Sequence, residues 1–262
     1  MRHRQPISGN RPLITFVRKP LRGFSLIELL VVVAIIAIVA GMLLPALAGG
    51  KERARRTDCR SHIRQFLLGI QMYADDNREF LPSGLSDKGE DEHVPVISSL
   101  TRTNLTKYVG ATRLLDCPSL GKPFDPFKGW YEGGYGYVIG YNYLGGHTNT
   151  PWPLTAAGLV AWTSPRKTSV PDSIQPLVTD MNDWSPGYRK TFAPHGANGP
   201  ILKDRRVGAG NDLAGGVTPS TIGAVGGNVG LMDGSVVWKA VTKMKRYRGS
   251  YMWDDEGCYA MW

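Results

Sequence analysis

Glu28 is the most unusual charged residue in the chain, because it interrupts an apolar run. Residues 24–48 read FSLIELLVVVAIIAIVAGMLLPALA, and Glu28 is their only charged side chain. As a helix this run would span about 37 Å, which exceeds the bilayer's hydrocarbon core of about 30 Å. A carboxylate within a membrane span is costly and is usually functional. The alternative is an acid near the helix end whose side chain reaches the headgroups.

The segment before this run is strongly basic. Residues 1–23 have no acidic residue and six basic ones: Arg2, Arg4, Arg11, Arg18, Lys19 and Arg22. Without them the formal net charge falls from +9 to +3. The basic balance is thus mostly a property of this leader, which indicates targeting, and nucleic-acid binding is not expected.

The three cysteines, Cys59, Cys117 and Cys258, have no CxxC spacing, so a zinc site is not predicted from them. If the domain is exported, one disulfide with one thiol left over could form, and Cys59 with Cys117 is the first candidate pair. The alternative is three free or buried cysteines.

Few other residues suggest chemistry. The five histidines are scattered, and the sequence has no HExxH motif, P-loop or GxSxG elbow. Asp180, Asn182 and Asp183, together with Asp233, could supply oxygen ligands to calcium, although ordinary turn formation explains the same residues. We expect no enzymatic activity and no cofactor, with calcium as the one candidate.

The junction before the apolar run reads Arg22-Gly23-Phe24-Ser25-Leu26-Ile27-Glu28. It resembles the prepilin-type cleavage and methylation segment of type IV pilins and type II secretion pseudopilins, over about residues 18–48. Four features carry the resemblance: a basic leader, a Gly before the cut, an aromatic residue after it, and a lone Glu four residues later.

This resemblance implies that a prepilin peptidase cuts between Gly23 and Phe24 and methylates the new amine of Phe24. The small Gly23 would let the backbone approach the protease closely. In the family, the acid at the position of Glu28 is thought to pair with the Phe amine of a neighbouring subunit during assembly. Pro45 also fits the family, where a proline near this point often accompanies a kinked or melted helix.

A weaker resemblance continues beyond the helix. Cys59 to Gln65 followed by Tyr73 to Asn77 looks like a prepilin-like group with CxxNLKQ and YxxDN segments, and Asp116 to Ser119 matches its CPS segment. Asp233-Gly234 resembles the group's terminal motif of His, nine residues and Asp-Gly. Here Gly223 replaces that histidine, and the nearest preceding histidine is His195.

The apolar run has a second interpretation as a secretory signal peptide. Such a peptide has an apolar region of about 7–15 residues and a small-residue cleavage site, which Ala46 to Ala48 could imitate. The length of the run favours a retained span. Six basic residues before the span and six soon after it nearly balance the positive-inside rule, so the orientation rests on the leader motif.

A helix is predicted to continue past the span to about residue 76. Ile63, Phe66, Leu67, Ile70 and Tyr73 recur at helical spacing and form an apolar stripe that would pack on a globular domain. Kinking or local melting is expected at Pro45 and at Gly49-Gly50.

The remainder is predicted to be rich in β-strands and loops. We expect two short strands or an irregular hairpin in Trp130 to Tyr143, and a strand at Leu177 to Thr179. Asn228 to Lys239 is a predicted hairpin around a two-residue Asp233-Gly234 turn. Residues 195–227 are glycine-rich and are expected to form a long surface loop.

The predicted fold is α+β, with a long N-terminal hydrophobic helix packed on a loop-rich antiparallel β domain. Its parts are a leader (1–23), a transmembrane and assembly helix (24–48), an amphipathic continuation (49–80) and a periplasmic or extracellular domain (81–262). The chain would be a single-pass protein of the bacterial cytoplasmic membrane that assembles with other pilin or pseudopilin subunits.

Two other functions remain open from the sequence. The chain could be a minor tip pseudopilin or a membrane-tethered binding module whose aromatic residues recognise a glycan or a secreted substrate. It could also be a secreted enzyme for which the apolar segment is only an export signal.

Overall fold

The computed structural model describes residues 25–120, 130–169, 172, 174–185, 190–197, 199–204, 222–252 and 257–262. The chain divides into two compact units, Met1–Ala46 and Leu47–Trp262. All three clusters of buried apolar side chains belong to the second unit.

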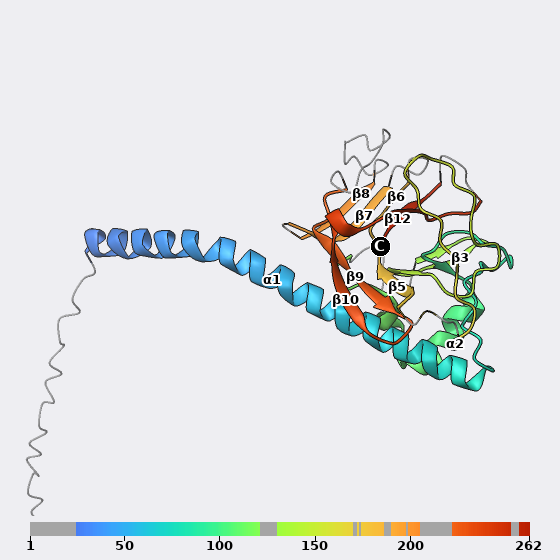
Figure 1. Ribbon diagram of the computed structural model, residues 1–262. Coiled ribbons are helices and arrows are strands. Elements are labelled where there is room, and N and C mark those ends of the chain that lie inside the picture. The colour runs from blue at the N-terminus through green and yellow to red at the C-terminus, as the bar shows by residue number, and fades with distance from the viewer. Residues whose placement is uncertain are drawn as a thin grey trace, which may run out of the picture. The chain divides into compact units, whose positions relative to one another are not determined.

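A single 51-residue helix, α1 (Leu26–Asp76), confirms the predicted N-terminal helix and its end (Figure 1). The apolar stripe in its second half is buried as expected, with Ile63 and Phe66 fully enclosed. Tyr73, at the end of the stripe, is half-buried, and its ring forms a T-shaped pair with the ring of Tyr108. Since these positions recur every three or four residues, one face of the helix contacts the domain.

A four-stranded antiparallel sheet packs on this helix face. In the order β10-β9-β5-β4, it contains β4 (Tyr141–Tyr143), β5 (Pro176–Asp180), β9 (Gly226–Leu231) and β10 (Val236–Ala240). The approach is close at Gly230 of β9, where an added Cβ would lie 2.6 Å from Ile63 Cγ2 and 2.8 Å from Leu67 Cδ1. A glycine lets the strand backbone reach the helix at this point.

Two further antiparallel sheets lie in the described part of the domain. One has the order β1-β3-β2 and contains β1 (Val96–Ile97), β2 (Trp130–Glu132) and β3 (Gly136–Val138). The other has the order β11-β12-β6-β7-β8 and contains β6 (Asp183–Ser185), β7 (Lys190–Gly196), β8 (Gly199–Asp204), β11 (Arg246–Arg248) and β12 (Tyr259–Met261). The arrangement is the predicted α+β fold.

Short helices lie between strands in the described part of the chain. They are α2 (Ser99–Val109), η1 (Thr112–Leu115) and η3 (Val241–Lys243). Ser98 caps the start of α2 by accepting a hydrogen bond from the Thr101 amide, and Gly110 ends it in the left-handed conformation. The helix therefore has a cap at each end.

Three local expectations need correction. Trp130 to Tyr143 contains three short strands, β2, β3 and β4, because β4 leaves its neighbours to pair with β5 in another sheet. Residues 195–227 are not one loop, since β7, β8 and β9 use part of them, while residues 205–221 lie outside the described residues.

The β9–β10 hairpin has a different turn from the expected one. Val236 pairs with Gly230 and the Leu231 amide donates to the Ser235 carbonyl, which leaves three residues, Met232 to Gly234, in the loop. Only Gly234 has a positive φ, of 81°, as in a turn whose last residue is left-handed. The Asp233 carboxylate accepts from the Ser235 amide at 2.8 Å instead.

Candidate functional site

Glu28 lies in the first turn of α1 and is the only acidic residue there. The Ser25 amide donates to Glu28 Oε2 at 2.9 Å. A carboxylate is favourable at this position because the free amides and the dipole make a helix N-terminus positive. Gly23 and Phe24, the predicted cleavage residues, lie outside the described residues, so processing stays a prediction.

The first part of α1 exposes a continuous set of large apolar side chains. Leu26 is 78% exposed and Met42 is 74% exposed, and the valines, isoleucines and leucines between them are exposed as well. By length and composition α1 could cross a membrane, although an N-terminal export signal would meet the same criterion. Because soluble monomers rarely expose apolar patches of this size, the segment needs a bilayer or other helices around it.

The helical backbone of α1 runs without interruption through Pro45 and Gly49-Gly50. The local melting expected there is therefore not present in this structure. A role for Pro45 within an assembled filament stays a prediction.

Cys59, Cys117, Asp180 and His195 form a buried group within the domain. One potential ligand atom from each lies within 4.8 Å of all the others. The two sulfur atoms of Cys59 and Cys117 are 2.7 Å apart, and both cysteines are free. The structure thus brings the predicted disulfide pair together, and the covalent bond itself stays a prediction.

Hydrogen bonds and burial shift the pKa values of three side chains in this group. The hydrogen bond with Cys117 lowers the pKa of Cys59 to about 7, although burial opposes this. Burial raises the pKa of Cys117 well above its usual value. Burial also lowers the pKa of His195, but the Asp180 carboxylate and the Cys59 sulfur outweigh it and raise that pKa to about 10. The group therefore favours a negative sulfur beside a positive imidazole.

The four candidate calcium ligands have different neighbours in the structure. Asp180 belongs to the cysteine–histidine group, whereas Asp183 accepts a hydrogen bond from Asn142 Nδ2 at 2.7 Å. Asn182 is buried with its amide nitrogen 3.8 Å from the sulfur of Met244. Asp233 is exposed in the β9–β10 turn. Calcium binding by these residues stays a prediction.

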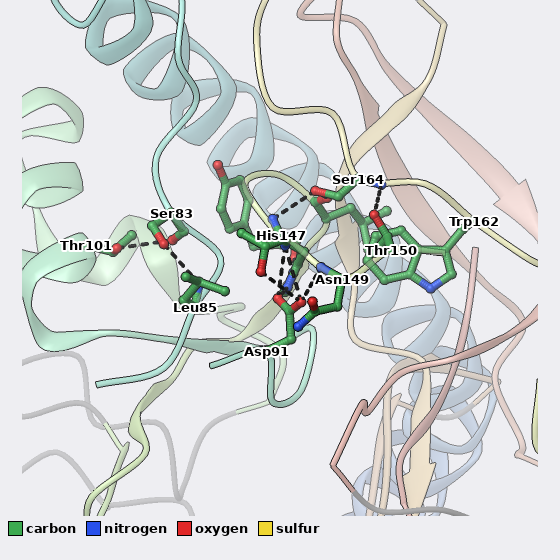
Figure 2. Close-up of polar contacts among 12 residues, drawn as sticks. Ser83, Leu85, Asp91, Thr101, His147, Asn149, Thr150, Trp162 and Ser164 are labelled. Carbon is green, nitrogen blue, oxygen red and sulfur yellow. Dashed lines mark hydrogen bonds and ion pairs between the residues drawn. The ribbon is translucent and has the colours of Figure 1, made fainter. Parts of the chain in front are cut away.

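A second buried histidine, His147, belongs to a network of side chains and backbone groups that hydrogen-bond to one another (Figure 2). Its Nδ1 lies 3.0 Å from Asp91 Oδ1 and its Nε2 lies 3.0 Å from the Tyr143 carbonyl oxygen. The Thr148 and Asn149 amides also donate to Asp91. Burial raises the pKa of Asp91, but the hydrogen bonds from His147 and Asn149 together lower it below its usual value. Since these polar groups already bond each other, the network fixes the surrounding loops.

A cavity of about 170 Å³ adjoins β2, β6 and β7. Its walls include the aromatic rings of Trp130, Trp184 and Phe192 and the carboxyl group of Asp183. Ligand pockets usually measure about 300–1,000 Å³, so this volume suits only a small group. Among the aromatic residues of 130–162, Tyr141, Tyr143 and Trp152 are buried in the core, whereas Tyr131 is exposed.

Comparison with known proteins agrees with the N-terminal features. Residues 18–44 match the family described as the prokaryotic N-terminal methylation motif. Over 59 residues the chain is 41% identical to the type IV wide pilus major component PilA4 of Thermus thermophilus, with 22% of this chain and 45% of that protein aligned.

Type II secretion system core protein G is also similar to the chain. The protein of Pectobacterium carotovorum is 37% identical over 59 residues, or 22% of this chain and 38% of that protein. The Escherichia coli protein is 37% identical over 59 residues, or 41% of its length. The aligned part spans less than half of each of these relatives. No solved structure matches the chain.

These matches confirm the predicted resemblance to type IV pilins and type II secretion pseudopilins in the N-terminal segment. The weaker resemblance around Cys59, Cys117 and Asp233 stays a prediction. The grouping of Asp180 and His195 with the two cysteines was missed, because their positions in the sequence are distant. The sequence gives signals only for the separate residues, because both cysteines lie in recognisable motifs and Asp180 is a candidate calcium ligand.

Proposed function

We propose that the chain is a structural subunit of a type IV pilus-like filament or a type II secretion pseudopilus. The observation that carries this proposal is the methylation motif over residues 18–44, followed by an exposed apolar helix with one acid in its first turn. Relatives that share this segment bear the names of a pilus component and a secretion-system core protein.

The first step would be proteolytic. A prepilin peptidase cleaves the bond between Gly23 and Phe24 and methylates the amine of Phe24. Cleavage removes the six basic residues of the leader and creates a positive amine one helical turn from Glu28. A charge-assisted bond between this amine and the Glu28 carboxylate of a neighbouring subunit would then set the register of assembly.

Before assembly, the subunit would reside in the bacterial cytoplasmic membrane with one span and a periplasmic or extracellular C-terminal domain. The exposed apolar part of α1 supports this location. During assembly, the same surface would leave the lipid and pack against the helices of other subunits. The role is structural, not enzymatic, and the partners are the peptidase and other pilin or pseudopilin subunits.

The N-terminus of the protein from its native host tests the proposal directly. The membrane fraction is digested and the N-terminal peptide is identified by mass spectrometry. A chain that begins with N-methylated Phe24 is the expected result. A chain that begins after Ala48, or that retains Met1, would reject processing by a prepilin peptidase.

Gly23→Val provides the matched variant. A branched side chain at the cleaved bond hinders close approach of the protease to the backbone, so we expect the uncut precursor to accumulate. Gly41→Ala is the control, since an added Cβ there meets no atom within 4 Å. Normal cleavage of Gly23→Val would contradict the proposed recognition of this residue.

A further inference from the structure

The buried group of Cys59, Cys117, Asp180 and His195 joins four separate segments of the chain. Cys59 belongs to α1, Cys117 follows η1, Asp180 ends β5, and His195 belongs to β7. All four side chains are at most 1% exposed. Thiolates, imidazole and carboxylate are the ligand types that zinc prefers in proteins.

Glu52, which is not one of the four residues, orients the imidazole of His195. Its Nδ1 lies 3.0 Å from Glu52 Oε1, and Glu52 also pairs with Arg56 at 3.1 Å. Its Nε2 faces Asp180 Oδ2 at 3.2 Å as an ion pair, but it makes no hydrogen bond of acceptable geometry among the described residues. A histidine that ligates a metal characteristically has its other ring nitrogen bonded to a carboxylate in this way.

The carboxylate of Asp180 likewise has one oxygen that accepts hydrogen bonds and one that does not. Its Oδ2 accepts hydrogen bonds from the Asn228 amide at 2.6 Å and from Asn228 Nδ2 at 3.0 Å. Its Oδ1 is buried without a hydrogen-bond partner in the described part of the chain. A buried polar atom without a partner is costly, and two such atoms in one group indicate a missing ligand.

We propose that Cys59, Cys117, Asp180 and His195 bind a zinc ion in tetrahedral geometry. Two thiolates, one imidazole nitrogen and one carboxylate oxygen complete four-coordinate zinc, which makes the site structural. In tetrahedral geometry, zinc–sulfur bonds of about 2.3 Å set the sulfur atoms about 3.8 Å apart, so the two cysteine side chains would rotate apart from their 2.7 Å separation on binding zinc.

The site would fasten α1 to the β domain. One ligand lies on the helix and two lie on strands of different sheets, β5 and β7. The ion satisfies Nε2 of His195 and Oδ1 of Asp180 together. A disulfide between Cys59 and Cys117 is the competing outcome, and it would leave both of these buried atoms without a hydrogen bond.

The first test uses the full-length chain, purified in detergent without chelators. We expect elemental analysis to find about one zinc ion per chain and thiol alkylation after denaturation to find all three cysteines reduced. Cobalt(II) added after zinc removal should give the visible bands of a tetrahedral thiolate site. A protein with no zinc above background and no cobalt bands, or one lighter by two hydrogens through a Cys59–Cys117 disulfide, would overturn the proposal.

Variants separate ligands from neighbours. Cys59→Ser and Asp180→Asn should lose zinc and the cobalt bands, whereas Cys258→Ser, at the third buried cysteine, should keep both. Glu52→Ala tests the positioning of His195, and we expect zinc affinity to fall about 10–100-fold. A variant that fails to fold does not decide the outcome, because the zinc content and cobalt spectrum of the wild-type protein test the proposal without any variant. Full zinc content in Asp180→Asn and Cys59→Ser would exclude this ligand set.

Discussion

Glu28 lies at the start of an exposed apolar helix, and this position determines which donors its carboxylate can bind. The carboxylate accepts a hydrogen bond from the Ser25 amide, so it already binds a donor at the helix end. A new amine at Phe24 would be a stronger donor because it is charged. The same acid can therefore be tolerated before assembly and paired within it.

Glu28→Ala should impair assembly and leave cleavage intact. A hydrogen bond to a charged group contributes about 1.5–3 kcal/mol, so each subunit addition should weaken about tenfold or more. The measurement is the yield of sheared filaments or pseudopili beside the mass of the processed N-terminus. Ser25→Ala is the control, because it keeps the backbone amide that Glu28 contacts. Normal filaments from Glu28→Ala would rule out the proposed pairing.

Asp183 predicts a specific dependence of stability on pH. Burial raises its pKa from 3.8 to about 8, although Asn142 donates to it. Because the pKa is higher in the folded state, the protonated form stabilises the fold below about pH 4, and this contribution is lost as pH rises through about 8. Its loss should destabilise the domain by roughly a few kcal/mol.

Asp183→Asn removes this titration and keeps the acceptor for Asn142. Relative to wild type, the variant should gain unfolding free energy as pH rises from 5 to 8.5, measured by denaturant titration of tryptophan fluorescence in the full chain. Asp75→Asn, at an exposed position of α1, is the control for removing one carboxylate. A difference between Asp183→Asn and wild type that does not change with pH would contradict a raised pKa.

The residues of the two candidate sites differ in how far the sequence could reveal them. Glu28 contrasts with the apolar residues on both sides, so local composition was sufficient to identify it. The cysteine–histidine group depends on the meeting of α1, β5 and β7, and no local spacing encodes that meeting. His195 stands out in the sequence only as the histidine nearest before Gly223, and no motif marks its partner Glu52.

At the scale of elements, α1 was predictable because its two halves have simple patterns. An uninterrupted apolar run and a 3.6-residue stripe both define helices without tertiary information. The strands are short, and their pairing follows from long-range contacts, so the transfer of β4 to the sheet of β5 was not predictable. Likewise, Asp233-Gly234 indicated a turn but not its length.

Two glycines of α1 provide a matched test of how the helix packs on the domain. A Cβ at Gly69 would lie 2.5 Å from Val109 Cγ2 and 3.2 Å from the Val109 backbone nitrogen, whereas a Cβ at Gly50 meets nothing within 4 Å. Overpacking costs about 1–3 kcal/mol, and alanine in a helix regains about 1 kcal/mol over glycine. Gly69→Ala should therefore lower the melting temperature of the full chain.

Gly50→Ala should leave that melting temperature unchanged or raise it. Near-ultraviolet circular dichroism can follow both variants, since it reports the packing of tryptophans in the domain. If Gly69→Ala were as stable as Gly50→Ala, α2 would not contact α1 closely at Val109.

At the scale of the whole molecule, apolar surface is unevenly distributed between the two units. The exposed large apolar side chains concentrate in α1 before residue 48, whereas the three core clusters belong to Leu47–Trp262. Folding of the domain and insertion into a membrane thus depend on different parts of the chain.

A protein that begins at Leu47 should therefore fold without detergent and remain monomeric. It retains the buried stripe of α1, all three sheets and the cysteine–histidine group, and it loses the segment that requires lipid or other helices. Size-exclusion chromatography and tryptophan near-ultraviolet circular dichroism would check this against the full chain in detergent. Aggregation of the shortened protein, with loss of its near-ultraviolet signal, would mean that residues before Leu47 also stabilise the domain.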